Sequence, residues 1–308
     1  MGTPDFAVPS LSKLIDAGYN IIAVITAPDK PAGRGLQLAE SDVKKFALEK
    51  NLKILQPVNL KDAAFIEELR ALHADLYVVV AFRMLPEVVW NMPPSGTINL
   101  HASLLPQYRG AAPINWAIIN GEKETGATTF KLRHEIDTGN ILFQEKIPIG
   151  DDETAGDLYN RMKDLGADLL LKTVRKISEH SVREIPQESI AINNTHTIQL
   201  NQLKTAPKIQ TETCRIDWNK SVEEVYNLIR GLAPYPGAFT MVNGKTFKIF
   251  KAIKELSPIN ESPGGTKTDH KTYLKFACTN GYIHAIEVQL EGKRKMNVGD
   301  FLRGNRIV

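Results

Sequence analysis

The chain has 308 residues, of which 43% are hydrophobic and 24% are charged, a balance typical of a globular protein with room for two domains. It contains no apolar run of about 20 residues that could cross a bilayer and no secretory leader, so we expect a cytoplasmic protein without a membrane partner. The net charge of +3 is unevenly divided, with −4 over residues 1–199 and +7 over residues 200–308, which favours an anionic partner for the last third of the chain.

The first hundred residues alternate between short apolar strands and amphipathic helices. The chain opens on a Gly2-Thr3-Pro4 turn that leads into a helix ended by Gly18. We predict strands at 19–25, 53–55, 75–81 and 97–100, and helices at 41–49, 62–72 and 86–90. This alternation indicates an α/β fold with a Rossmann-like, doubly wound and mostly parallel sheet, whose ligands lie beyond the carboxyl ends of the strands.

The rest of the chain divides into a completion of this fold, a linker and a second domain. A strand pair at 124–132 and 140–147 and a long helix at 154–179 precede a polar stretch without periodicity. After it, a helix at 221–231 leads into many short strands with turn signals, which predicts a smaller β-barrel. We place the first domain at residues 1–182, the linker at 183–202 and the barrel domain at 203–308. The two cysteines, Cys214 and Cys278, fit no metal spacing, and we expect no metal.

The segment from Thr97 to Trp116, TINLHASLLPQYRGAAPINW, carries the side chains best suited to catalysis. Asn99 and His101 are two residues apart on a predicted strand, so they point to the same side of it. One supplies an amide donor and the other a group that titrates near neutrality, and acyl-type chemistry needs such donors. Further on, Asp137 in a Thr-Gly turn is a carboxylate suited to orienting the imidazole.

The pattern Asn-x-His-x-Ser-Leu-Leu-Pro-x-x-Arg-Gly from Asn99 to Gly110, with Asp137-Thr138-Gly139 after it, resembles the folate-dependent formyltransferases. Over nearly the whole chain, the likeness is to the members that act on methionyl-tRNA. It implies transfer of the formyl group of 10-formyltetrahydrofolate, a co-substrate, to the α-amino group of methionyl-initiator tRNA. In this family an apolar strand precedes the turn at Gly2, and we expect that the chain lacks it.

The resemblance also assigns roles to individual residues. Asn99 and His101 donate hydrogen bonds to the carbonyl oxygen of the formyl group, and Asp137 orients His101 and relays the proton of the amine. The folate-binding residues it implies are Phe82, Arg83, Met84, Leu85, Ser103, Leu104, Leu105 and Pro106. Arg83 departs from the small residue expected at its position, so we expect its side chain to point away from the folate.

A loop rich in glycine and proline, TAPDKPAGRGLQL from Thr26 to Leu38, is too long for a simple connection. In the methionyl-tRNA branch of the family, such a loop inserts against the acceptor end of the tRNA. The resemblance further implies that the barrel domain is OB-like and presents a basic surface to nucleic acid. We expect tRNA contacts from Lys30, Arg34, Lys44, Lys204 and Lys208.

Two alternatives remain open at the level of sequence. The same catalytic domain serves formyltransferases that act on nucleotide-linked amino sugars and enzymes that hydrolyse formyl-folate. A non-catalytic RNA-binding protein is the second alternative, because the first strand is missing. The Arg34 loop and the basic last third favour tRNA as the partner of a bacterial-type enzyme, which we expect to be a monomer.

Overall fold

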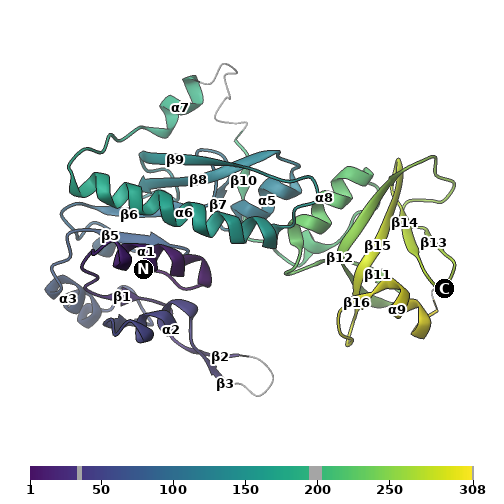
Figure 1. Ribbon diagram of the computed structural model, residues 1–308, viewed down its shortest axis with the longest axis horizontal. Helices are drawn as coiled ribbons and strands as arrows, with labels where there is room; N and C mark the ends of the chain where they lie inside the picture. Colours follow the sequence, from purple (N-terminus) through teal and green to yellow (C-terminus); the bar gives the residue numbers. More distant parts are fainter. Residues whose placement is uncertain (33–36, 194–202, 307–308) are drawn as a thin grey trace. The chain divides into compact units, whose positions relative to one another are not determined.

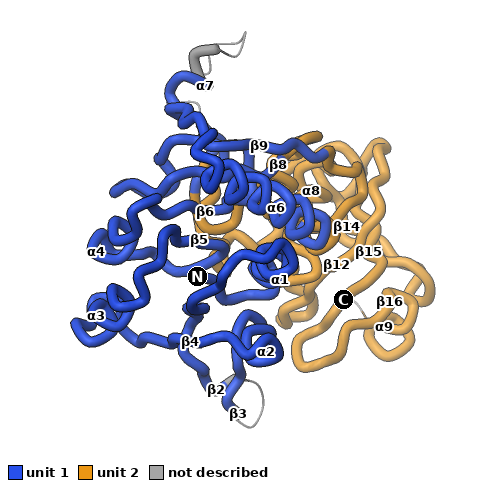
Figure 2. The backbone as a smooth tube through the Cα atoms, turned by 60° about the vertical axis from the view of Figure 1, so that its left-hand side comes forward, with its two compact units in different colours: residues 1–109, 126–147, 159–204 blue, residues 110–125, 148–158, 205–308 orange. Residues whose placement is uncertain are grey.

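The computed structural model describes residues 1–32, 37–193 and 203–306, and the chain divides into two compact units (Figure 1, Figure 2). Unit 1 consists of residues 1–109, 126–147 and 159–204. Unit 2 consists of residues 110–125, 148–158 and 205–308, so two short segments from the middle of the sequence belong to it (Figure 2). The fold is a mixed α/β unit together with a unit built on an antiparallel sheet, and the predicted fold class is confirmed at this level.

The main sheet of unit 1 has the strand order β5-β6-β8-β9. These strands are β5 (Tyr77–Val80), β6 (Thr97–His101), β8 (Glu124–Lys131) and β9 (Ile141–Pro148). Strands β5 and β6 are parallel, with Val80 opposite Leu100, whereas β6 and β8 are antiparallel. The long helix α6 (Ala155–Ser178) packs on this sheet, because Gly166 leaves room for Leu100 and the Thr173 and Thr129 hydroxyls lie 2.8 Å apart.

A second pair of strands, β1 (Val24–Ile25) and β4 (Ile54–Leu55), is also parallel. Met1 and Gly2 connect it to the main sheet: the Gly2 amide donates to Ile25 O at 3.0 Å, and the Val80 amide donates to Met1 O at 2.9 Å. Only the last two residues of the strand predicted at 19–25 form a ladder. The preceding residues face a cavity instead of a neighbouring strand.

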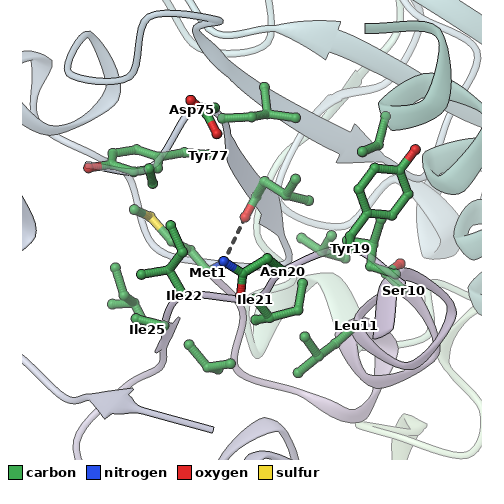
Figure 3. Close-up of a pocket in the computed structure, with 18 of the residues that line it drawn as sticks. Met1, Ser10, Leu11, Tyr19, Asn20, Ile21, Ile22, Ile25, Asp75 and Tyr77 are labelled. Carbon is green, nitrogen blue, oxygen red and sulfur yellow. Dashed lines mark hydrogen bonds between the residues drawn. The ribbon is translucent and has the colours of Figure 1, made fainter. Parts of the chain in front are cut away.

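This cavity has a volume of about 530 Å³ and is lined mainly by apolar side chains (Figure 3). Its lining includes Ile21, Ile22 and Tyr77 (Figure 3). The α-ammonium of Met1 is buried here and donates a 2.7 Å hydrogen bond to Val78 O (Figure 3). Burial lowers the pKa of this amino group from 8.0 to about 5, because the charged form loses its hydration.

Within the described part of residues 1–109, unit 1 also contains five short helices, and a side-chain cap marks the start of two of them. They are η1 (Asp5–Ala7), α1 (Val8–Asp16), α2 (Asp42–Glu49), α3 (Ala63–Ala71) and α4 (Glu87–Trp90). Ser41 caps α2 by accepting from the Lys44 amide at 3.1 Å, and Asp62 caps α3 by accepting from the Phe65 amide at 3.0 Å. Strands β2 (Lys30–Ala32) and β3 (Gln37–Ala39) form an antiparallel pair. Helix α7 (Gln187–Asn193) occupies part of the stretch predicted to be an irregular linker.

Unit 2 is organised around an antiparallel sheet with the strand order β11-β12-β15-β14-β13, and β16 pairs with β15. Its elements are α5 (Pro113–Ile119), β10 (Thr205–Ala206), η3 (Glu212–Cys214), α8 (Val222–Leu232), β11 (Ala238–Val242), β12 (Lys245–Leu256), β13 (Thr266–Thr268), β14 (Leu274–Ala277), β15 (Gly281–Leu290), β16 (Met296–Asn297) and α9 (Val298–Gly304), with β7 (Arg109–Gly110) at the boundary. Helix α8 starts with a capping box between Ser221 and Glu224, and its apolar side joins the core formed with Phe247, Phe276 and Phe301. Within the described ranges, no helix is long and apolar enough to cross a membrane.

Candidate active site

Asn99 and His101 lie on one face of β6, as their spacing predicts. His101 ends the strand opposite Thr128 of β8, and Asn99 lies opposite Phe130. The His101 side chain is buried, with 8% of its surface exposed, whereas Asn99 is partly exposed. In the part of the chain that the structure describes, the Asn99 carboxamide has no hydrogen-bond partner, so it is available to a ligand.

The two nitrogens of His101 have different neighbours. Nε2 lies 2.9 Å from Tyr108 O, and because a carbonyl oxygen can only accept, Nε2 carries a proton. Nδ1 lies 3.9 Å from Oδ2 of Asp137. This separation is too long for a direct hydrogen bond, but one oxygen or nitrogen atom at about 2.9 Å from each group fits between them. His101 and Asp137 therefore face each other without a direct hydrogen bond.

Asp137 reaches this position through an unusual turn. Strand β8 runs antiparallel to β6 and ends opposite Ile98, so the connection from β8 to β9 must fold back to bring Asp137 beside His101. Asp137 has a left-handed backbone, with φ of 55°. Gly139 packs so closely that a Cβ atom there would lie 1.6 Å from Lys131 O. Only glycine fits this position.

Gln187, which was not among the residues predicted from sequence, holds the same turn. Its side chain is 1% exposed, and its Nε2 donates to Asp137 O at 2.8 Å and to Gly139 O at 2.9 Å. Its Oε1 accepts from Nε and Nη2 of Arg109 at 3.1 and 2.6 Å. The polar stretch around it has no periodicity, so no local signal pointed to this residue.

Hydrogen bonds hold the Ser103–Pro106 turn that follows β6. The Ser103 hydroxyl is fully buried and donates to Gln107 O at 2.7 Å. Thr128 ties the turn to β8, because its hydroxyl donates to Ser103 O at 2.6 Å and accepts from the Leu105 amide at 3.1 Å. Leu105 and Pro106 are buried, and Leu104 is partly exposed.

Phe82, Arg83, Met84 and Leu85 follow β5, and because β5 and β6 are parallel, this segment leaves the sheet at the same edge as the Ser103–Pro106 turn. Nη1 of Arg83 donates to Val58 O at 2.8 Å and Nη2 donates to Pro57 O, which fixes the guanidinium against the loop before α3. Met84 is 70% exposed, whereas Leu85 is buried in the core beside Val89.

The residues expected to contact tRNA differ in their exposure to solvent and in their ion pairs within the protein. Lys30, Lys204 and Lys208 are exposed, and Arg34 lies outside the described residues. Lys44 is only 15% exposed, and its ammonium pairs with Asp29 and, at 2.8 Å, with Glu40. The hydrogen bond from Lys44 lowers the pKa of Asp29, so Lys44 already has anionic partners within the protein.

Over residues 1–32, 37–193 and 203–306, no three potential metal ligands gather at one place.

Models of known families match both parts of the chain. A model described as formyl transferase matches residues 1–174, and a model described as the formyl transferase C-terminal domain matches residues 208–306. The chain therefore belongs to the formyltransferase family, which the sequence pattern from Asn99 to Gly110 resembles.

Within this family, the chain is similar over nearly its full length to proteins of one kind. The chain is 51% identical over its whole length to a methionyl-tRNA formyltransferase of Bacteroides thetaiotaomicron, covering 95% of that protein. It is 54% identical over 312 residues to the methionyl-tRNA formyltransferase of Phocaeicola vulgatus, covering 94% of it. The crystal structure of WlaRD, a sugar 3N-formyl transferase in the presence of dTDP and 5-N-formyl-THF, matches with a TM-score of 0.67 and 22% identity over 95% of this chain and 97% of that one. The last likeness concerns the fold alone.

Proposed function

We propose that this formyltransferase transfers the formyl group of 10-formyltetrahydrofolate to the α-amino group of methionine on initiator tRNA. The observation that carries the proposal is the placement of Asn99, His101 and Asp137 around one end of β6. The full-length likeness to two methionyl-tRNA formyltransferases supports the choice of acceptor.

The chemistry requires a neutral amine and a stabilised carbonyl oxygen. As the amine nitrogen attacks the formyl carbon, a C–N bond forms and the oxygen gains negative charge. Asn99 donates a hydrogen bond to this oxygen, and Nδ1–H of His101 donates a second one when both ring nitrogens carry protons, because Nε2 already donates to the Tyr108 carbonyl and is held in place by it. Asp137 accepts the proton that the amine loses, directly or through water, while the bond from the carbon to N10 breaks and N10 gains a proton.

The folate site extends along the edge where β5 and β6 end. Phe82 and Met84 offer partly exposed apolar surface there, and Leu85 and Leu105 support it from the core. Backbone groups of residues 82–85 and 103–106 supply hydrogen bonds to the pterin. The sugar transferase of related fold was solved with 5-N-formyl-THF, which supports a folate co-substrate.

The tRNA contacts in this proposal come from two parts of the chain. Lys30 and Arg34 belong to the Thr26–Leu38 loop sequence, and Lys204 and Lys208 lie at the start of the last third. We assign residues 1–182 to a Rossmann-like, doubly wound catalytic domain and 203–308 to an OB-like tRNA-binding domain. Residues 183–202 form the linker, whose Gln187 packs on the catalytic domain. The protein acts as a cytoplasmic monomer in this proposal.

The decisive experiment offers the purified protein three acceptors with 10-formyltetrahydrofolate: methionyl-initiator tRNA, a nucleotide-linked amino sugar, and water. We expect formyl-methionyl-tRNA as the product. Transfer to the sugar alone, or hydrolysis alone, would replace the proposed acceptor. If the protein retained tRNA but did not turn over folate even at high concentration, it would be a binding protein.

The matched variant is Asp137→Asn, which keeps the shape of the side chain and removes its charge. It should lose most of kcat, whereas its affinity for tRNA should stay nearly unchanged because the Asp137 carboxylate faces the buried His101 ring. Full activity of this variant would remove Asp137 from the mechanism.

A further inference from the structure

The Gln187 carboxamide connects the two sides of the active-site imidazole. On one side, Arg109 directly follows Tyr108, whose carbonyl oxygen accepts the hydrogen bond from Nε2 of His101. On the other side, Asp137 faces Nδ1. Gln187 bonds to both, since it accepts two hydrogen bonds from Arg109 and donates two to the backbone of the Asp137 turn.

Every hydrogen-bonding site of the Gln187 carboxamide has a partner. A glutamine side chain has two N–H donors and one carbonyl oxygen with two lone pairs, and here each of these four sites has a partner. Because the side chain is 1% exposed, water cannot replace a missing partner. No other side chain has the same shape, two donors and an acceptor in these directions.

The turn that Gln187 holds requires such support. Asp137 has a φ of 55°, a conformation that costs free energy for a residue with a side chain and persists only where the surroundings impose it. Within the turn, the Thr138 hydroxyl donates to Glu135 O at 3.1 Å, a bond that does not reach the Asp137 carbonyl. The carbonyl groups of Asp137 and Gly139 instead converge on one Nε2 atom.

We propose that Gln187 is a positioning residue for formyl transfer, acting with Arg109 to set the distance between Asp137 and His101. The inference rests on the role of Asp137 in the proposed function. Gln187 does not touch the reacting atoms. It fixes the carboxylate on one side of the imidazole and, through Arg109, the segment that carries the Tyr108 carbonyl on the other.

Two variants separate the hydrogen bonds that Gln187 donates to the turn from those that it accepts from Arg109. Gln187→Glu keeps an oxygen acceptor for Arg109 and loses both donors to the turn, whereas Gln187→Met loses all four hydrogen bonds. We expect kcat to fall between about 10-fold and 10²-fold in Gln187→Glu, because a displacement of about 1 Å is sufficient for such losses. The KM values for folate and tRNA should change by less than about twofold. Glu188→Gln, at the exposed neighbouring position, is the control and should behave as the parent protein.

A double-mutant cycle with Asp137→Asn distinguishes positioning from general stabilisation. If Gln187 acts through Asp137, the Gln187→Glu change should reduce kcat in the parent protein and have little further effect in the Asp137→Asn protein. An equal reduction in both backgrounds would overturn the proposal and leave Gln187 with a structural role. Unchanged kcat in Gln187→Glu, with Asp137→Asn inactive, would overturn it as well while leaving the proposed function intact. Full activity of Asp137→Asn would instead overturn the proposed function.

A second measurement does not depend on turnover. The ring ¹⁵N signals of His101 report the charge and hydrogen bonding at both nitrogens. Gln187→Glu and Asp137→Asn should each move the Nδ1 signal, and the double variant should move it no further than Asp137→Asn does. A parent-like spectrum in Gln187→Glu would show that the turn holds its position without the carboxamide, contrary to the proposal.

Discussion

Oδ2 of Asp137 lies 3.9 Å from Nδ1 of His101, with both side chains nearly buried. The separation has a chemical use, because one atom of a substrate or a water molecule can bond to both groups at once. In the proposed reaction, this gap leaves room for the substrate amine or a water molecule between the carboxylate and the imidazole. The spacing therefore suits a proton transfer that passes between the two groups.

Asn99→Leu should reduce kcat by about 10²-fold to 10³-fold, because it removes one donor to the developing oxyanion. The melting temperature should change little, since the carboxamide of Asn99 has no partner among the described residues. Single-turnover rates and thermal unfolding test the two parts. Asn91→Ala, at an exposed amide on the surface, is the control. A large loss of stability in Asn99→Leu would indicate a structural role instead.

Gly139→Ala should displace the Asp137 turn, because a Cβ atom would lie 1.6 Å from Lys131 O. We expect a loss of at least about 2 kcal/mol in the free energy of unfolding, the usual effect of overpacking, together with a loss of kcat. Urea unfolding and formyl transfer measure the two effects. Gly304→Ala, where a Cβ atom would meet open space, should leave both unchanged. Parent-like behaviour of Gly139→Ala would mean that the turn can move without cost.

Arg34→Ala should weaken the use of tRNA and leave folate binding unchanged. Arg34 lies outside the described residues, and the expectation comes from its place in the PAGRG loop. Because the variant would neutralise one phosphate fewer, kcat/KM for methionyl-tRNA should depend less steeply on salt, by about one unit of the logarithmic slope. Lys45→Ala, at an exposed lysine beyond the loop, serves for comparison. An unchanged salt slope would exclude Arg34 from the tRNA-binding surface.

A polypeptide that begins at Met1 should gain stability as the pH increases from 5 to 8. The α-amino group of Met1 has a pKa of about 5 in the folded protein and 8.0 when exposed. Between these values the unfolded chain binds more protons, so raising the pH favours the folded state, by up to about 4 kcal/mol over the window. Glu255, whose pKa a hydrogen bond from Lys275 lowers to about 2, titrates below this range. Urea unfolding at several pH values tests the slope, and a flat profile would contradict the burial of the amine.

In a polypeptide that begins at Met1, a short apolar strand added ahead of this residue should increase stability. Five alternating apolar residues fused to Met1 would convert the buried amine into a peptide group and fill part of the 530 Å³ cavity. We expect a rise of several degrees in the melting temperature at pH 6 and a weaker dependence on pH. A fusion of the same length with charged residues at the inward positions is the control. Equal melting temperatures for the two fusions would show that the cavity does not accept a strand.

Features with local determinants were predictable from the sequence. Asn99 and His101 share a strand face because their spacing matches the pleat, and Ser41 and Asp62 cap the helices that follow them. Gln187 was not predictable in this way, because its partners lie 48 to 78 positions earlier in the chain and meet it only in the folded protein.

The strand predicted at 19–25 shows that β propensity alone does not determine where a strand pairs with a neighbour. Its β-branched residues favour an extended conformation, but a ladder requires a neighbouring strand on the correct side. Met1 and Gly2 provide such a neighbour only near Ile25, and the strand is correspondingly short. The predicted linker at 183–202 likewise contains helix α7, whose first residue is anchored by tertiary contacts.

The position of Gln187 in the sequence, after residue 182, determines which truncated fragments of the enzyme keep its side chain. A fragment ending at residue 182 would retain the amide, the imidazole and the carboxylate, and would still lack the group that fixes the carboxylate. The same cut would separate α5 from α8, although the Asn115 carboxamide donates to Gly231 O at 2.8 Å across that pair. A shortened version of this transferase must therefore extend past Gln187, and it must include α8 if α5 is to keep this contact.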